Sequence, residues 1–194
     1  MIIVKHRVNL TAELQTVPHN FGVEIDVRSF NGEIILQHNP LEAGERFIDW
    51  ITHFNHELLI LNVKEEGLEV NLISILKNYN INSFFLLDQS FPSLYRMSQN
   101  SPQLVSIRAS DFEPISTSIL LNPGWVWLDS HSGNWEYLIE SMALLKETKV
   151  KTCLVSPELQ RQDSKGELMM LKTMIRKKSL EFDAVCTKSP DYWL

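Results

Sequence analysis

The sequence predicts an α/β fold, a compact single-domain (β/α)8 barrel over residues 1–194. Short apolar runs of strand character alternate with longer amphipathic segments, which is typical of a parallel sheet with crossover helices. There are eight such runs, the number that closes a barrel. No proline- or serine-rich linker, low-complexity tract or short internal repeat divides the chain. We therefore expect one domain.

The predicted strands are short, mostly apolar runs bounded by polar, glycine or proline residues. The second strand differs, because it reads Gly-Val-Glu-Ile-Asp-Val and carries two acids within an apolar pattern. In chain order, strands are expected over residues 2–5, 22–27, 58–63, 83–87, 104–107, 125–129, 152–156 and 184–187.

Segments with apolar residues at helical spacing separate most of these strands. The clearest follows the seventh strand, where Leu168, Leu171 and Met174 share one face and lysine and arginine lie on the other. Such barrels typically need about 250 residues, so this one would be small. Seven residues follow Thr187, and we therefore expect the closing helix to be short or missing.

Composition and charge limit the classes of function. The formal net charge of −6 argues against a broad nucleic-acid interface, which usually needs a basic face. No apolar run approaches the roughly 20 residues that span a bilayer, and the first residues lack a signal-peptide pattern. Cys153 and Cys186 lie in apolar stretches and fit reduced core residues. We expect a cytoplasmic protein with no membrane span and no nucleic-acid partner; the sequence does not predict its oligomeric state.

Glu24 and Asp26 are the most informative pair in the chain. Side chains two apart on a strand point the same way, so the two acids share one small volume. Burying two like charges is costly unless a cation compensates them. Paired hard oxygens suit a divalent metal such as Ca2+ or Mg2+. The pair therefore predicts a divalent-cation site.

Two histidines are expected close to these acids. His6 ends the first strand, and residues 31–32, Asn-Gly, are a strong hairpin signal. Folding about this turn pairs Asp26 with Gln37 and brings His38 within about 5 Å of the acids, one strand spacing. Strict pairing points His38 to the wrong face, which a bulge or a one-residue slip would correct. Both histidines titrate near neutral pH and suit acid/base catalysis.

The neighbouring strand ends add an amide and two cations. Asn62 and Lys64 share a phase at the end of the third strand, and Arg7 follows the first strand. Arg7 offers phosphate a planar fork, and Lys64 offers it a point charge. A metal held by the two acids and the Asn62 carbonyl would act as a Lewis acid on a phosphate oxygen. Together these groups predict a phosphodiesterase.

In this order, the motifs resemble those of the glycerophosphodiester phosphodiesterase family, one of the phospholipase C-like TIM barrels. The family pattern is HRG, E-x-D, HD and E-x-K, and the matching segments here are His6-Arg7, Glu24-Ile-Asp26, His38-Asn39 and Asn62-Val-Lys64. The resemblance implies a (β/α)8 barrel, a divalent cation and a glycerol-type phosphodiester substrate. By motif match, the acid/base pair would be His6 and His38, the phosphate contacts Arg7 and Lys64, and the metal ligands Glu24, Asp26 and, in the third acid's place, Asn62.

Three positions depart from the family pattern. Val8 stands where the family has glycine. Asn39 replaces an aspartate that orients the histidine, which keeps a hydrogen bond but loses the charge. Asn62 replaces the third acidic ligand and leaves two formal negative charges around the metal. We therefore predict weaker metal binding than in typical members, and a more open pocket, because a helical insertion after the HD motif is missing.

Other strand ends supply candidate pocket residues, and other interpretations stay open. Asn39, Trp127 and Glu158 are candidates to line the substrate pocket, whereas Arg108 would contact phosphate or pair with Asp129. Alternatively, the acids are neutralised by cations in a metal-free network, with the third-strand amide as a plain hydrogen-bonding residue. The protein would then bind a phosphorylated glycan or polyol without turnover. A sugar-phosphate isomerase is disfavoured, since the last two strands lack an evident glycine-rich phosphate loop.

Overall fold

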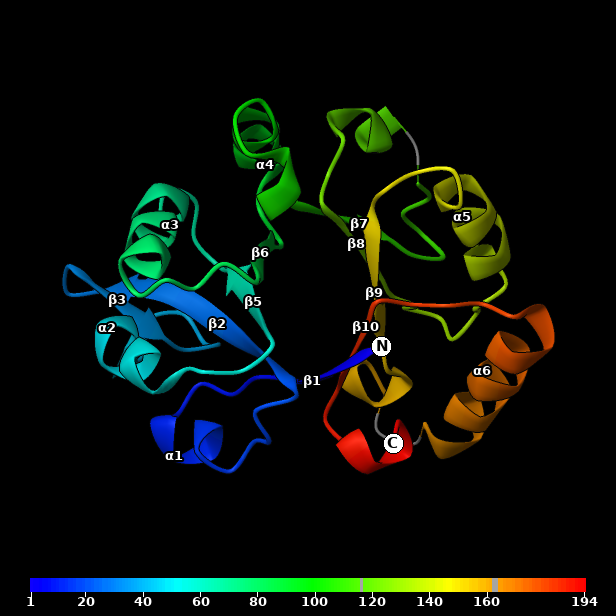
Figure 1. The fold of residues 1–194 in the computed structure, drawn as a ribbon, viewed down its shortest axis with the longest axis horizontal. Helices are drawn as coiled ribbons and strands as arrows, with labels where there is room; N and C mark the ends of the chain where they lie inside the picture. Colours follow the sequence, from blue (N-terminus) through cyan, green and yellow to red (C-terminus); the bar gives the residue numbers. More distant parts are fainter. Residues whose placement is uncertain (116, 162–163) are drawn as a thin grey trace.

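Eight parallel strands close into a barrel at the centre of the molecule (Figure 1). The computed structural model describes residues 1–115, 117–161 and 164–194. The strand β10 pairs with β1 and completes the ring, which confirms the predicted barrel. Around the ring the order is β1 (Ile2–Lys5), β2 (Gly22–Phe30), β5 (Leu58–Val63), β6 (Phe84–Leu87), β7 (Ser106–Ala109), β8 (Trp125–Leu128), β9 (Lys151–Val155) and β10 (Ala184–Thr187).

The extent of pairing between neighbouring strands differs around the ring. β2 and β5 pair in register from Gly22 to Val27, whereas between β6 and β7 the described residues show one isolated bridge, from Leu86 to Val105, the residue before β7. β7 begins later than the sequence predicts, because the 3-10 turn η2 (Pro102–Leu104) occupies the residues before it. The strand pair that carries the predicted site is thus the more firmly paired part of the ring.

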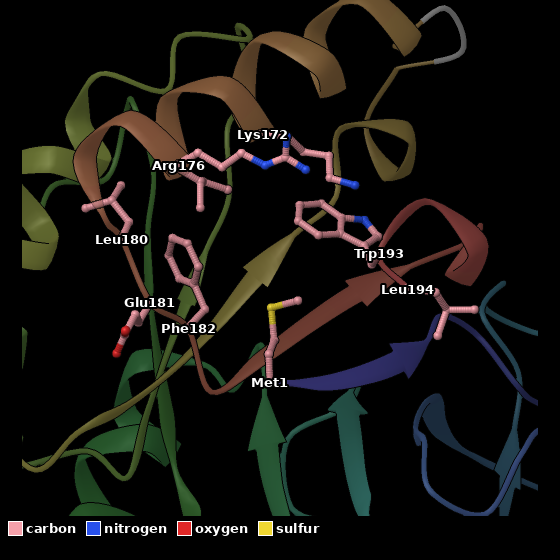
Figure 2. A pocket seen from close by; sticks show the side chains of 9 residues that line it. Met1, Lys172, Arg176, Leu180, Glu181, Phe182, Trp193 and Leu194 are labelled. Atoms are coloured by element: carbon pink, nitrogen blue, oxygen red, sulfur yellow. The ribbon is translucent and has the colours of Figure 1, made fainter.

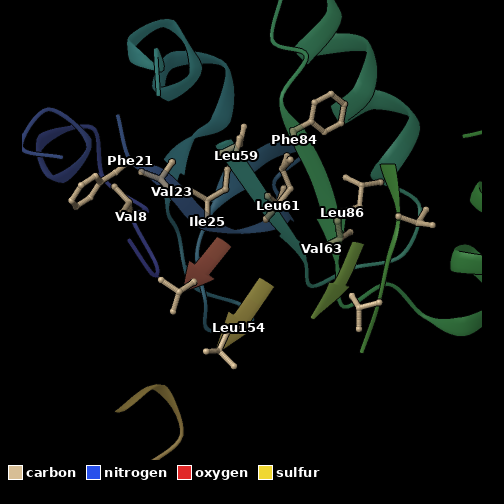
Figure 3. Packing of buried hydrophobic residues seen from close by; sticks show 14 of the residues in the cluster. Val8, Phe21, Val23, Ile25, Leu59, Leu61, Val63, Phe84, Leu86 and Leu154 are labelled. Atoms are coloured by element: carbon tan, nitrogen blue, oxygen red, sulfur yellow. The ribbon is translucent and has the colours of Figure 1, made fainter. Parts of the chain in front are cut away.

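Alternate side chains of each strand face the inside and the outside of the barrel. Val23, Ile25, Leu59 and Leu61 belong to the outer layer between strands and helices (Figure 3). A second cluster fills the interior, made of Val4, Leu58, Ile60, Phe85, Leu87, Trp125, Trp127, Cys153, Val155, Ala184 and Cys186. Both cysteines are free and buried, as predicted. By alternation with the outer residues of β2, the two acids of that strand share the inner phase.

The second strand extends beyond the barrel into a hairpin. β2 pairs antiparallel with β3 (Glu33–Leu36), which pairs with β4 (Glu45–Arg46). Asn31 and Gly32 have φ angles of 50° and 83°, the left-handed values that a type I′ turn requires. The backbone N–H of Gln37 donates to Asp26 O at 3.0 Å. The predicted hairpin and its register are therefore confirmed.

Helices surround the barrel, but several crossovers are reduced to single turns (Figure 1). This economy lets a chain of 194 residues close the ring. Among the described residues, no helix is both long and apolar enough to cross a membrane. The longer helices are α3 (Glu69–Asn78), α4 (Phe91–Ser98), α5 (Tyr137–Leu145) and α6 (Lys165–Lys178); the short elements are α1 (Thr11–Leu14), α2 (Phe47–Trp50), η1 (Ile51–His53), η3 (Thr117–Leu121) and η4 (Pro157–Leu159).

The closing helix is reduced to the 3-10 turn η5 (Pro190–Tyr192), as predicted. A groove of about 480 Å³ lies between α6 and the last residues of the chain. Figure 2 shows Met1 and Phe182 on one side of this groove and Lys172 near Trp193 on the other. The Nζ atom of Lys172 lies 5.3 Å from the centre of the Trp193 ring. After β10, the chain therefore covers this side of the barrel with the Trp193 indole beside α6, and not with a closing helix.

Candidate active site

Two buried acids mark the carboxyl-terminal end of the barrel. Glu24 and Asp26 are each 1% exposed. The register of β2 and β5 places Asn62 beside Asp26, and Asn62 is also buried. The structure thus brings together the three side chains that the sequence predicts as metal ligands.

The chain turns at Arg7, and this residue contacts both acids. Its backbone has a left-handed φ of 56°, which is uncommon outside glycine. In this conformation the Arg7 N–H donates to Glu24 Oε2 at 2.8 Å. The Arg7 Nε atom lies 3.2 Å from Asp26 Oδ2. One residue therefore contacts one carboxylate through its backbone and the other through its side chain.

Asp26 is compensated by two cations. The Nζ atom of Lys64 lies 3.3 Å from Asp26 Oδ1, and Arg7 Nε is close to Oδ2. The Asn9 side chain also donates to Oδ2, at 3.0 Å. The charge of Asp26 is therefore largely balanced by groups of the protein itself, as the metal-free interpretation expects.

Glu24 lacks such compensation. Among the described residues, the one basic side chain within 4 Å is His6, whose Nε2 atom lies 3.7 Å from Oε2 and carries a charge only when the imidazole is protonated. Burial and, second to it, the nearby charge of Asp26 raise the pKa of Glu24 to about 7, while hydrogen bonds from the Arg7 N–H and the Asn62 side chain act in the opposite direction. Without a cation nearby, the carboxyl therefore keeps its proton to a higher pH than an ordinary glutamate. An added positive charge nearby would favour the charged form.

Three buried oxygen atoms of this cluster have no hydrogen-bond partner in the part of the chain that the structure describes: Glu24 Oε1, Asp26 Oδ1 and Asn62 Oδ1. An unsatisfied buried polar group costs about 1–3 kcal/mol. Carboxylate and amide oxygens are also the ligands that Ca2+ and Mg2+ prefer, so the residues fit a hard divalent cation. Within residues 1–115, 117–161 and 164–194, no three His, Cys, Asp or Glu side chains gather as metal ligands. The third ligand here would accordingly be an amide.

His6 lies at the inner edge of the same cluster. Its side chain is 13% exposed, and its Nδ1 atom has no hydrogen-bond partner. Burial lowers the pKa of His6 to about 3, and the positive charges of Arg7 and Lys188 contribute to the decrease. The imidazole is therefore neutral at pH 7, and the prediction that it titrates near neutral pH is wrong for the cation-free structure, because burial and neighbouring positive charges disfavour its protonated form.

His38 lies just beyond β3, where the hairpin returns toward the barrel. Its Nδ1 atom is 3.2 Å from Asn39 Oδ1, so the orienting contact expected of Asn39 is present. Asn39 Nδ2 in turn donates to Glu42 at 3.1 Å. No hydrogen bond or ion pair among the described residues joins the His38 side chain to His6 or to the buried acids. His38 directly follows Gln37, whose N–H donates to Asp26 O, but its own side chain makes its hydrogen bond to Asn39.

Comparison with known proteins bears on the fold. No protein-family model matches the chain, and no curated protein sequence matches it. The structure is similar to that of a glycerophosphodiester phosphodiesterase from Agrobacterium tumefaciens, with a TM-score of 0.69 and 12% sequence identity over 99% of this chain and 97% of that chain. The chain has the same barrel fold. A glycerophosphodiester phosphodiesterase from Parabacteroides distasonis gives a TM-score of 0.65 at 12% identity, over 98% of this chain and 93% of that chain.

The predicted pocket residues Trp127 and Glu158 have other neighbours. Trp127 belongs to the interior cluster and is 4% exposed, so little of its ring is open to a substrate. Glu158 accepts hydrogen bonds from the Thr187 hydroxyl and from the Lys188 N–H, the latter at 3.1 Å. Glu158 therefore links the ends of β9 and β10. The assignment of both residues to a substrate pocket stays a prediction.

Arg108 occupies the inner phase of β7 and pairs with acids. Its Nη1 atom lies 2.7 Å from Asp129 Oδ2, and its Nη2 atom pairs with Asp88. Of the two roles expected from the sequence, the structure shows the pairing with Asp129. The guanidinium is thus already engaged on the side of the barrel formed by β6, β7 and β8.

Two residues near this cluster were not predicted from the sequence: Lys188, whose charge acts on His6, and Asn9. Lys188 follows β10 and continues the inner phase of Ala184 and Cys186, so strand alternation was a signal that could have found it. Asn9 contacts Asp26 from the loop after β1. No periodic pattern marks Asn9, and its role becomes visible only in the fold.

Proposed function

We propose that this protein is a phosphoric diester hydrolase that cleaves a small glycerol- or polyol-type phosphodiester with the help of Ca2+ or Mg2+. The main support for this proposal is the burial of Glu24 and Asp26 side by side on β2. Both carboxylates are almost fully buried, and one oxygen of each lacks a hydrogen-bond partner. The similarity in fold to two glycerophosphodiester phosphodiesterases supports the substrate class.

Arg7 and Lys64 are the proposed phosphate contacts. Their side chains are 42% and 20% exposed, respectively, so each reaches from the buried Asp26 toward solvent. A guanidinium and an ammonium group at the edge of the site would neutralise a phosphodiester oxygen and fix its orientation. Each contact to phosphate would replace part of the present contact to Asp26.

His6 and His38 are the proposed acid/base pair. Neutral His6 would take the proton from the attacking hydroxyl, which belongs to water or to the substrate next to the phosphate. His38, held through Nδ1 by Asn39, would give a proton to the leaving oxygen as the P–O bond breaks. Attack by a substrate hydroxyl would form a cyclic phosphate first.

The cation would be held by Glu24, Asp26 and the Asn62 amide oxygen. When bound, it would supply Lewis-acid polarisation of a phosphate oxygen. The chain keeps one oxygen of each side chain buried and without a hydrogen bond to the described residues, so that binding the cation would break no hydrogen bond and would displace only the Lys64 ammonium from Asp26. The small-molecule substrate and two free, buried thiols suit an enzyme of the reducing cytoplasm.

A second candidate function is binding without turnover. Asp26 is already paired with Arg7 and Lys64, and the third ligand is an amide instead of an acid. A site in which the protein balances its own charges has less need of a metal. Such a barrel would bind a phosphorylated glycan or polyol as a binding or regulatory protein.

Metal-dependent hydrolysis separates the two candidates. Purified protein would be assayed with bis(p-nitrophenyl) phosphate and with glycerophosphodiesters, in Ca2+, Mg2+ or Mn2+ and in excess chelator. We expect turnover that needs the metal, is lost in His6→Ala and is kept in His53→Ala, a matched change at an exposed histidine. Absence of metal-dependent turnover, or full turnover in His6→Ala, would reject the hydrolase. Calorimetric binding of a phosphorylated polyol would then favour the second candidate.

A further inference from the structure

Asn9 replaces β1 as the neighbour of β2 beside the acids. β1 pairs with β2 at two positions, the second being Lys5 with Val23. After the chain turns, the Val8 N–H donates to Glu24 O at 2.8 Å. The next inward-facing residue of β2, Asp26, donates its backbone N–H to Asn9 Oδ1 at 2.9 Å. A side-chain amide thus continues the row of hydrogen bonds that β1 begins.

The other end of the same amide contacts the Asp26 carboxylate. Asn9 Nδ2 donates to Asp26 Oδ2 at 3.0 Å, the oxygen that also faces Arg7 Nε. Asp26 Oδ1 has no hydrogen bond and only the ion pair with Lys64. The two oxygens of this buried carboxylate are therefore not equivalent. Asn9 and Arg7 contact one oxygen, whereas the Lys64 ammonium is the only polar contact of the other among the described residues.

We propose that Asn9 is a positioning residue, which fixes Asp26 so that Oδ1 is the oxygen offered to a divalent cation. The inference rests on the proposed function, because the cation is part of it. Asn9 accepts from the backbone N–H of Asp26 and donates to its carboxylate. These two contacts restrict rotation of the Asp26 side chain. Asp26 Oδ1, which has no hydrogen bond to the described residues, then faces the cation together with Glu24 Oε1 and Asn62 Oδ1.

The choice of asparagine follows from this double contact. Its side chain carries an acceptor and a donor on one rigid plane. Aspartate would keep the acceptor but set a second carboxylate against Asp26, and serine has one polar atom for the two contacts. Closing the row of backbone hydrogen bonds requires the acceptor alone. The donor to Asp26 Oδ2 is not needed for that row, and it is the part of the side chain that holds the carboxylate.

The test compares Asn9→Ala with the wild type in calorimetric titrations of Mg2+ and of Ca2+. Partners that orient metal ligands typically contribute 10–100-fold to affinity, so we expect binding about tenfold weaker. The matched control is Asn134→Ala, which removes an amide that accepts from the Glu136 N–H in the loop after β8 and should bind the cations like the wild type. Affinity in Asn9→Ala within twofold of the wild type would overturn the proposal.

Asn9→Gln is a second variant, and a crystal structure of the variant is a second measurement. If Asn9→Ala does not fold, Asn9→Gln retains the amide but displaces it by one methylene, and it should also bind more weakly. If the wild type binds neither cation, the proposed function fails, and a crystal structure of the variant decides the role of Asn9. An Asp26 carboxylate rotated away from its present contact with Arg7 supports positioning. An unchanged carboxylate overturns it.

Discussion

The Nζ atom of Lys64 lies 3.3 Å from Asp26 Oδ1, the carboxylate oxygen that has no hydrogen-bond partner. A divalent cation bound to that oxygen would meet the lysine as a like charge at close range. Cation and lysine therefore compete for one atom. Because a displaced Lys64 is free to contact phosphate, cation binding and substrate binding should strengthen each other, as linkage requires.

Lys64→Met should bind Mg2+ and Ca2+ about fivefold more tightly than the wild type, since a partly exposed ion pair is worth about 1 kcal/mol at most. The same variant should bind inorganic phosphate more weakly. Calorimetric titration with each ligand measures both effects, with Lys77→Met on the exposed face of α3 as the control. Weaker cation binding in Lys64→Met would contradict the competition.

Asn62→Asp should tighten cation binding by about tenfold, equivalent to about 1.4 kcal/mol, because it adds a third negative charge beside Glu24 and Asp26. In chelator the variant should be less stable than the wild type, since three carboxylates then crowd one buried volume. Asn82→Asp makes the same change at an exposed position. If both variants bind the cation like the wild type, Asn62 does not lie at the cation site.

Glu24→Gln should stabilise the metal-free protein increasingly as the pH rises. The pKa of Glu24 is raised to about 7 in the folded protein, from an ordinary value of about 4.3. The folded state therefore holds more protons than the unfolded state between these values, and the stability that depends on this carboxyl falls as pH increases through that window. The unfolding free energy of Glu24→Gln minus that of the wild type should grow by about 2 kcal/mol from pH 5 to pH 8. Urea unfolding in chelator measures this difference. A difference that does not change with pH would show that Glu24 is charged throughout.

Asn39→Ala should lower kcat and leave cation affinity unchanged. Asn39 Oδ1 is the hydrogen-bond partner of His38 Nδ1, so its loss would free the imidazole to rotate away from the leaving group. General acid catalysis contributes about 10²–10⁴-fold, and we expect losing its orientation to cost about tenfold. Steady-state kinetics and cation titration of the same sample test this. Equal kcat in variant and wild type would remove His38 from the proposed acid/base pair.

Much of the fold could be predicted because strand and helix periods alternate clearly. The bounds of β1, β5 and β10 agree with the sequence patterns, and the Asn31-Gly32 turn fixed the hairpin register through its left-handed backbone. The start of β7 could not be predicted, because Leu104, which precedes Val105 and has strand character, is the last residue of a 3-10 turn over residues 102–104. The spacing of apolar residues alone does not distinguish such a turn from the start of a strand.

The shared burial of Glu24 and Asp26 followed from their spacing, since alternation on a strand is a local property. The conformation of Arg7 did not, because a left-handed backbone at a non-glycine residue is selected by its contacts to both acids. The role of Asn9 depends on how far β1 runs beside β2. That distance is set by the closed barrel and leaves no mark in the local sequence.

Anomalous diffraction from crystals soaked in Mn2+, as a stand-in for Mg2+, tests whether the two acids and Asn62 bind a cation. We expect a single strong peak in contact with Glu24 Oε1, Asp26 Oδ1 and Asn62 Oδ1, with Lys64 moved away from Asp26. No peak at saturating Mn2+, with Arg7 and Lys64 still paired to Asp26, would contradict it and leave a charge network that needs no metal.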